Sequence, residues 1–148
     1  MKAKNNIPIS SIAGRCQLYL IHFIPWIADH IGKNFYLIGS DYIYPHETNA
    51  HIRSLLQVYQ GKVLVEDYTP LGKQKFEENV KKIQELVPDI VFSTLVGSSA
   101  VAFYKQYYEA GIKKPIASLI TAETEVAALD PKCTVGHFLK KFTKFAKC

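Results

Sequence analysis

Three apolar segments of the chain each end in residues that could contact a small polar molecule. Tyr42 and Tyr44 follow the first segment, Gly97 follows the second, and Glu123 follows the third. A tyrosine ring offers a flat apolar face, and its hydroxyl can hydrogen-bond a polar solute. Glycine lets the backbone approach a ligand closely, and a carboxylate accepts an ammonium or amide N–H. Together these residue types indicate a binding site for a small polar solute.

The position of these residues at strand ends supports the same interpretation. Ser98, directly after Gly97, opens a helical pattern whose free N–H groups favour a carboxylate or an amide oxygen. In an open α/β sheet the carboxyl ends of parallel strands meet at one edge, and ligands bind there. Each tyrosine taken alone could equally pack at the sheet edge. The convergence of three such loops is what favours binding.

The sequence offers no arrangement of side chains that would support catalysis. Its histidines are His22, His30, His46, His51 and His137. His46 and His51 share one predicted helix but are five residues apart, which separates them by about 140° around the axis. The nucleophile motif G-x-S-x-G, the dinucleotide motif G-x-G-x-x-G and the phosphate-binding Walker motif are absent from the sequence. We therefore predict a protein that is not an enzyme, with no catalytic residues, no metal and no cofactor.

Hydrophobic periodicity predicts the elements that position these residues. Strands are expected at 35–38, 62–68, 89–96 and 115–120, with a helix before the first, one between each successive pair, and a short one at 121–129. Such alternation requires crossover connections between parallel strands. The predicted fold class is therefore α/β, a Rossmann-like parallel sheet with helices on both faces.

Apolar stripes predict the buried faces of the helices. The first helix is expected from Gln17 to Gly32, with Pro25 kinking it or dividing it into two pieces, and Pro45 is expected at the first position of the second helix. The expected stripes are Leu20, Ile24, Ile27 and Ile31 in the first helix, Ile52, Leu55, Leu56 and Tyr59 in the second, Phe76, Val80, Ile83 and Leu86 in the third, and Val101, Tyr104, Tyr108 and Ile112 in the fourth.

Composition and charge divide the chain into three parts. Residues 1–16 are polar and patternless, which predicts an unstructured leader, residues 17–138 form a single α/β ligand-binding domain, and residues 139–148 form a basic tail. The net charge is +5, but four lysines lie within the last nine residues and leave about +1 for residues 1–139. The tail could contact nucleic acid or an anionic membrane, or it could be a solvated terminus. We expect the solvated terminus and no nucleic-acid partner.

The remaining global signals are weak. Cys16, Cys133 and Cys148 contain no C-x-x-C pair and suggest neither a disulfide framework nor a metal site. No run of 18 apolar residues occurs, so no membrane span is expected. The apolar stretch 16–28 is interrupted by polar residues and is not followed by a small-residue cleavage site, so we expect no signal peptide.

Four ordered motifs carry a family resemblance. They are YLIGSDYIYP at 36–45, EDYTPLG at 66–72, DIVFSTLVG at 89–97 and AFYKQ at 102–106, and ETEVAA at 123–128 also fits. The chain resembles the type I periplasmic binding proteins, in the branch of ABC transporter substrate-binding proteins that take urea, short-chain amides or branched-chain amino acids. Family members have two α/β lobes that close on a ligand. This chain looks like a fragment containing most of the second lobe.

The resemblance implies a site, partners and a location. The ligand contacts of the second lobe would fall at Tyr42 and Tyr44, at Val96 and Gly97, and at Glu123. The implied partners are a small polar solute (urea, an amide or an amino acid) and an ABC transporter permease. The implied location is the periplasm, or the cytoplasm if the chain has no signal peptide. As an isolated lobe, the chain is expected to bind its solute weakly.

Two other functions remain open at this point. The same branch includes a cytoplasmic amide-sensing regulator, so a sensor is one alternative. The other is a homo-oligomeric interaction protein, in which the exposed face of the lobe meets a second chain. An enzyme with a Rossmann-like fold ranks last because the chain has no cofactor motif.

Overall fold

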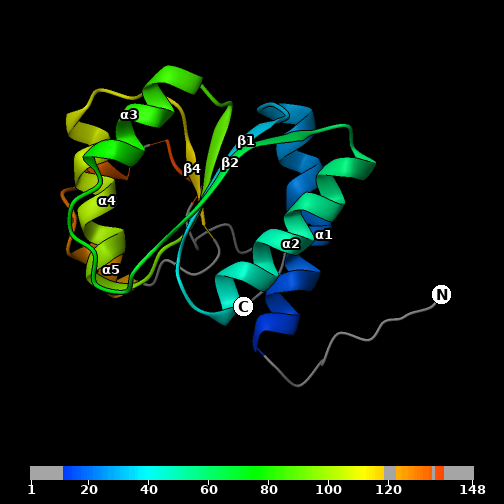
Figure 1. Cartoon of the computed structure of the whole chain (residues 1–148), viewed down its shortest axis with the longest axis horizontal. Helices are drawn as coiled ribbons and strands as arrows, with labels where there is room; N and C mark the ends of the chain where they lie inside the picture. The colour runs from blue at the N-terminus through cyan, green and yellow to red at the C-terminus, as the bar shows by residue number, and fades with distance from the viewer. Residues whose placement is uncertain (1–11, 119–122, 135, 139–148) are drawn as a thin grey trace.

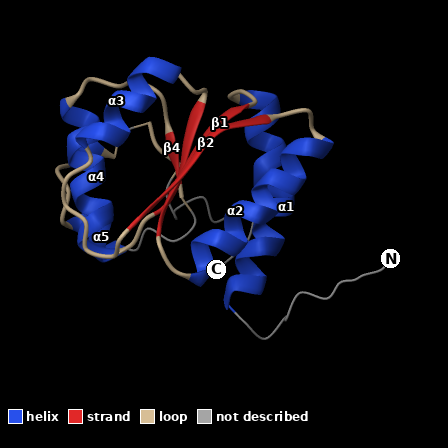
Figure 2. Cartoon of the chain, viewed as in Figure 1, coloured by secondary structure: helices blue, strands red, loops and turns tan. Residues whose placement is uncertain are grey.

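The computed structural model describes residues 12–118, 123–134 and 136–138, and for residues 12–19, 123 and 124 it describes the backbone only. Helices and strands alternate along this part of the chain, as Figure 2 shows. The helices are α1 (Ile12–His30), α2 (Ile43–Val58), α3 (Glu77–Leu86), α4 (Gly97–Glu109) and α5 (Glu123–Ala127), the strands are β1 (Asn34–Ser40), β2 (Lys62–Thr69), β3 (Ile90–Thr94) and β4 (Ile116–Ala117), and a 3-10 turn spans Pro131–Cys133.

The strands form one parallel sheet in the order β2-β1-β3-β4. Helices α1 and α2 lie on one side of the sheet, and α3, α4 and α5 lie on the other (Figure 1). The predicted α/β class with helices on both faces is therefore confirmed. The chain turns from one face to the other between neighbouring strands β1 and β3, which makes their shared carboxyl end a topological switch point.

Strand β1 supplies the centre of both cores because its side chains alternate between the two faces. Phe35 and Leu37 pack into the cluster under α1 and α2, whereas Tyr36 and Ile38 pack into the cluster under α3 and α4. All four side chains are fully buried. A strand covered on both faces needs a continuous apolar run, which explains why this strand was predictable.

The far edge of the sheet is covered by residues from the end of the described chain. Phe138 pairs in parallel with Ala117. The Phe138 N–H donates to the Ile116 carbonyl at 2.8 Å, and the Ser118 N–H donates to the Phe138 carbonyl at 2.9 Å. Beside it, His137 Nδ1 accepts the Ile116 N–H at 2.9 Å, and burial lowers the pKa of His137 to about 4. Strand β4 is therefore held from both sides.

The first helix differs from its prediction in two ways. It begins at Ile12 rather than Gln17, because Ile12 and Cys16 stand eight and four residues before Leu20 and extend its stripe. The expected leader is therefore helical from Ile12, while its residues 1–11 and the basic tail at 139–148 lie outside the described residues.

Pro25 lies inside one helix instead of dividing it in two. A proline in a helix interior costs about 3 kcal/mol. Its neighbours Phe23, Ile24 and Ile27 are all buried against the sheet, and burial of each such side chain contributes about 1.5–3 kcal/mol. Packing therefore outweighs the proline.

The predicted stripes of α2 and α3 are correct in part. Ile52 and Leu56 are buried, but Tyr59 is 39% exposed. Helix α2 begins at Ile43, so Pro45 is its third residue rather than its first. A proline is tolerated there because the first-turn N–H groups have no acceptor within the helix. Phe76, which directly precedes α3, and Val80 and Ile83 within it are buried as expected, and Leu86 is 43% exposed.

The predicted stripe of α4 has the wrong phase. The helix buries Ala100, Phe103, Tyr104 and Tyr107, while Tyr108 is 47% exposed and Val101 is only half-buried. The buried set follows the same helical spacing as the predicted one, and Tyr104 belongs to both. Phe103 and Tyr107 give this face more aromatic area to bury, and the opposite face is left free to line a groove.

Candidate functional site

The candidate site lies at the switch point, where the loops after β1 and β3 are fastened together. The Val96 N–H donates to Ser40 Oγ at 3.3 Å. Gly39 permits this close approach, because a Cβ at that position would clash with the Thr94 hydroxyl and lie 2.9 Å from Pro45 Cβ. The two loops therefore keep a fixed separation at this edge.

The two predicted tyrosines occupy different environments. Tyr42 is the extended residue that precedes α2, and its side chain is 37% exposed. Burial, and then the negative charge of Glu125, raise the pKa of Tyr42. Tyr44 is half-buried and packs against the core cluster under α1 and α2. The structure thus brings Tyr42 near the carboxylate of α5, whereas Tyr44 packs with the cluster under α1 and α2.

A carboxylate occupies the N-terminus of α4. Gly97 is the first residue of this helix and has a φ of 62°, a conformation that favours glycine. Its N–H donates to Glu125 Oε2 at 2.5 Å. The preceding residue, Val96, is extended and has no side-chain acceptor to cap the helix, so Glu125 of α5 supplies the acceptor from outside.

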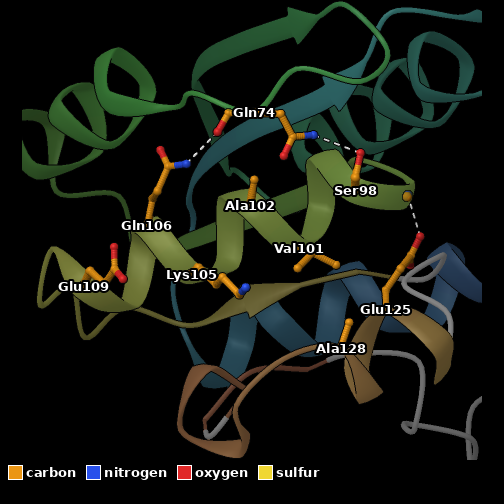
Figure 3. A pocket seen from close by; sticks show the side chains of 10 residues that line it. Gln74, Ser98, Val101, Ala102, Lys105, Gln106, Glu109, Glu125 and Ala128 are labelled. Carbon is orange, nitrogen blue, oxygen red and sulfur yellow. Dashed lines mark hydrogen bonds between the residues drawn. The ribbon is translucent and has the colours of Figure 1, made fainter.

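A groove of about 660 Å³ extends from this point along the outer face of α4. Figure 3 shows its walls, formed by α4, α5 and the segment that carries Gln74. Its lining comprises Gln74, Gly97, Ser98, Val101, Ala102, Lys105, Gln106, Glu109, Glu125 and Ala128. The volume lies within the range of small-molecule sites, and most of the lining side chains are polar or charged.

One wall of the groove is the segment 70–76 between β2 and α3, here called the strap. Gln106 of α4 holds its main chain: Gln106 Oε1 accepts the Phe76 N–H at 2.8 Å, and Gln106 Nε2 donates to the Gln74 carbonyl at 2.7 Å. The side chain of Gln74 then reaches across the groove. Its Nε2 donates to Ser98 Oγ at 2.9 Å and to the Gly72 carbonyl at 3.1 Å.

A second polar cluster lies beside β2, and its side chains contact one another. His46 stacks on Tyr68 with 3.7 Å between ring centroids and contacts Asp41 Oδ1 at 2.9 Å. The Tyr68 hydroxyl donates to Glu66 and accepts from Asn49 Nδ2 at 3.1 Å. Burial, followed by the hydrogen bond to Glu66, raises the pKa of Tyr68 to about 12. This hydroxyl stays protonated at neutral pH and is not a general base.

No metal centre is seen in the part of the chain that the structure describes. Among these residues, no three His, Cys, Asp or Glu side chains are grouped so as to hold an ion. In the same residues, no helix has both the length and the apolar character to cross a membrane.

The structure groups some predicted site residues and adds others. Tyr42, Val96 and Gly97 lie at the same edge. Glu123 is the first residue of α5, and its side chain lies outside the described residues. Sequence reasoning missed Glu125, as well as the groove-facing residues of α4. Ser98, Val101, Ala102 and Lys105 are spaced along one face of α4. If the buried stripe had been assigned to the correct face of this helix, the sequence would have identified these four residues as the face that lines the groove.

A family-wide comparison matches most of the chain. The model described as "Periplasmic binding protein domain" matches residues 16–143. This range contains both loops of the switch point, the strap and the whole groove.

Solved structures of similar fold have chains about two and a half times as long. An extracellular ligand-binding receptor from Rhodopseudomonas palustris HaA2 has a TM-score of 0.75 and 14% identity over 83% of this chain and 35% of its own. A branched-chain amino acid ABC transporter periplasmic ligand-binding protein from Burkholderia xenovorans LB400 has a TM-score of 0.68 and 20% identity over 77% and 31%. A solute-binding protein of an ABC transporter from R. palustris, in complex with benzoate, has a TM-score of 0.62 and 17% identity over 72% and 28%.

Proposed function

The chain belongs to the periplasmic binding protein family, and on that premise we propose that it binds a small polar solute at the carboxyl edge of its sheet for an ABC transporter. The proposed solute is urea, a short-chain amide or an amino acid. The proposed role is binding without chemical conversion, without a metal and without a cofactor, in the periplasm where family members act.

The observation that carries the proposal is the grouping of three kinds of polar atom at the switch point. The Gly97 N–H, the Glu125 carboxylate and the Tyr42 phenol come from the loops or helices after β3, β4 and β1. In the proposed complex the carboxylate accepts an N–H of the solute, and the phenol hydrogen-bonds it or covers its apolar part. Val96 and the neighbouring Glu123 are proposed as further contacts.

The solute class has partial support from the similar proteins. One of them is described as a branched-chain amino acid ABC transporter ligand-binding protein, and another was solved with benzoate. Both descriptions name a small organic solute. Because the chain spans about a third of those proteins, we propose that it supplies only part of a solute's contacts. A site with only part of its contacts loses several kcal/mol of binding free energy, and a loss of about 4 kcal/mol weakens a micromolar Kd to about millimolar.

Chemical-shift titration tests the proposal. The isotope-labelled chain is titrated with acetamide, urea and leucine, each to about 100 mM, a range that covers a millimolar Kd. We expect saturable shifts centred on the amides of Gly97, Tyr42 and Glu125, and weaker shifts in Tyr42→Phe and Glu125→Gln. Tyr108→Phe, at an exposed tyrosine outside the groove lining, is the matched control. Shifts centred elsewhere, or none with any solute, would refute the proposal.

A second candidate function rests on exposed apolar side chains at the same edge. Ile43 is 73% exposed after β1 and Leu71 is 60% exposed after β2. Exposed apolar groups near one another are typical of contact with another protein. Light scattering at micromolar concentration separates the two candidates, because a stable dimer favours an interaction protein and a monomer favours a solute-binding lobe.

A further inference from the structure

We propose that Gln74 is a built-in competitor for the solute, and that its carboxamide occupies the position on Ser98 that a primary amide would take. This inference rests on the proposed function and deepens it, because it selects primary amides from the candidate solutes. It assigns to the strap a role that goes beyond forming a wall of the groove.

The contact between Gln74 and Ser98 has the geometry of a bound amide. Gln74 Nε2 donates to Ser98 Oγ at 2.9 Å and to the Gly72 carbonyl at 3.1 Å. Figure 3 shows the carboxamide extended toward the Ser98 hydroxyl on the first turn of α4, while Glu125 approaches the same turn from the other side, where it accepts the Gly97 N–H. A carboxamide therefore already lies at the end of the groove where the proposed solute contacts converge.

The same contact can open without disturbing the fold. Both Gln74 and Ser98 are exposed side chains, so water or a solute can reach their hydrogen bond directly. The strap itself is held by Gln106, which bonds the main chain at Gln74 and at Phe76. Release of the Gln74 side chain therefore leaves the strap and the groove in place.

The chemistry of the displaced group identifies the competing solute. A side-chain carboxamide has two N–H donors and one carbonyl acceptor, and acetamide and propionamide carry the same group. A primary amide can donate to Ser98 Oγ as Gln74 does and direct its second N–H to the Glu125 carboxylate. An amino acid such as leucine has no carboxamide, so its binding gains little from the removal of Gln74.

A double-mutant cycle tests this inference. Apparent Kd values for propionamide and for leucine are measured by chemical-shift titration for wild type, Gln74→Ala, Ser98→Ala and the double variant. One hydrogen bond typically contributes enough for about a fivefold change in Kd. We expect Gln74→Ala to bind propionamide about fivefold more tightly than wild type, and leucine equally. In the Ser98→Ala background, removal of Gln74 should bring no gain.

The control and the outcomes separate this inference from the function on which it rests. Gln84→Ala is the matched control, because Gln84 Nε2 also donates to a main-chain carbonyl, that of Ala110, at 3.3 Å, and Gln84 does not line the groove. Equal propionamide affinity in wild type and Gln74→Ala, with saturable binding in both, overturns the inference and leaves the function intact. An equal gain for propionamide in both Ser98 backgrounds also overturns it. Absence of saturable binding in every variant overturns both.

Discussion

The partly buried imidazole of His137 predicts that the chain loses stability in mild acid. His137 Nδ1 accepts the Ile116 N–H at 2.9 Å, and the ring lies against the rings of Tyr104 and Tyr107. Protonation would place two N–H donors face to face and charge a ring that is partly shielded from water. Burial accordingly lowers the pKa of His137 from 6.5 to about 4. The perturbation is a change of pH from 7.5 to 4.5.

The sign and size of the effect follow from linkage. Because the folded-state pKa lies below the unfolded value, the unfolded chain binds more protons between pH 6.5 and about 4. The contribution of His137 to the free energy of unfolding is therefore complete above pH 6.5 and is lost as the pH falls toward 4. One pKa unit corresponds to about 1.4 kcal/mol, so the loss at pH 4.5 is about 2.5 kcal/mol.

Urea unfolding at the two pH values measures this loss. The free energy of unfolding of wild type should fall from pH 7.5 to pH 4.5 by about 2.5 kcal/mol more than that of His137→Gln. In this variant a glutamine oxygen can still accept the Ile116 N–H but cannot titrate. His22→Gln, at an exposed histidine on α1, is the matched control and should follow wild type. Equal losses in wild type and His137→Gln would refute the reasoning.

Three further variants test other parts of the structure. Gly39→Ala should lower the free energy of unfolding by about 2 kcal/mol, because its Cβ would clash with the Thr94 hydroxyl, and urea unfolding measures this. Glu125→Gln should lower the pKa of Tyr42, followed by its ring resonances, but only in part, because burial is the larger cause of the raised value. Gln106→Ala should release the strap, lowering stability by about 1 kcal/mol and speeding tryptic cleavage at its lysines.

Each of these variants has an outcome that would contradict its reasoning. Wild-type stability in Gly39→Ala would mean that the two loops of the switch point can separate freely. An unchanged pKa of Tyr42 in Glu125→Gln would mean that the carboxylate and the phenol do not interact. If trypsin cleaves the strap of Gln106→Ala no faster than that of wild type, the two hydrogen bonds of Gln106 do not hold it.

Elements defined by local patterns were predictable from the sequence. The continuous apolar run at 35–38 predicted β1, because a strand buried on both faces needs apolar side chains at every position. The family to which the chain belongs was also recognisable from its motifs. The exact phase of α4 was not, because two stripes that share Tyr104 have equally good helical spacing and only the sheet decides which is buried.

The polar contacts of the groove join residues that are far apart in the sequence, so no local sequence pattern predicts them. Gln106 bonds the main chain at Phe76, 30 residues earlier. Glu125 reaches the Gly97 N–H from 28 residues further along the chain. No periodicity links such pairs, and the motif comparison pointed to Glu123 instead. Tyr42, Val96 and Gly97 do lie at the expected edge, and their contact with a solute stays a prediction.

The pairing of Phe138 with Ala117 also bears on when the chain can fold during synthesis. Phe138 contacts the ring of Trp26 edge-on, with 5.5 Å between centroids. The first helix therefore completes its packing only after residue 138 has left the ribosome, more than a hundred residues later. Contacts of such wide sequence separation slow folding. We expect nascent chains that end before residue 138 to leave the β4 edge open to chaperones.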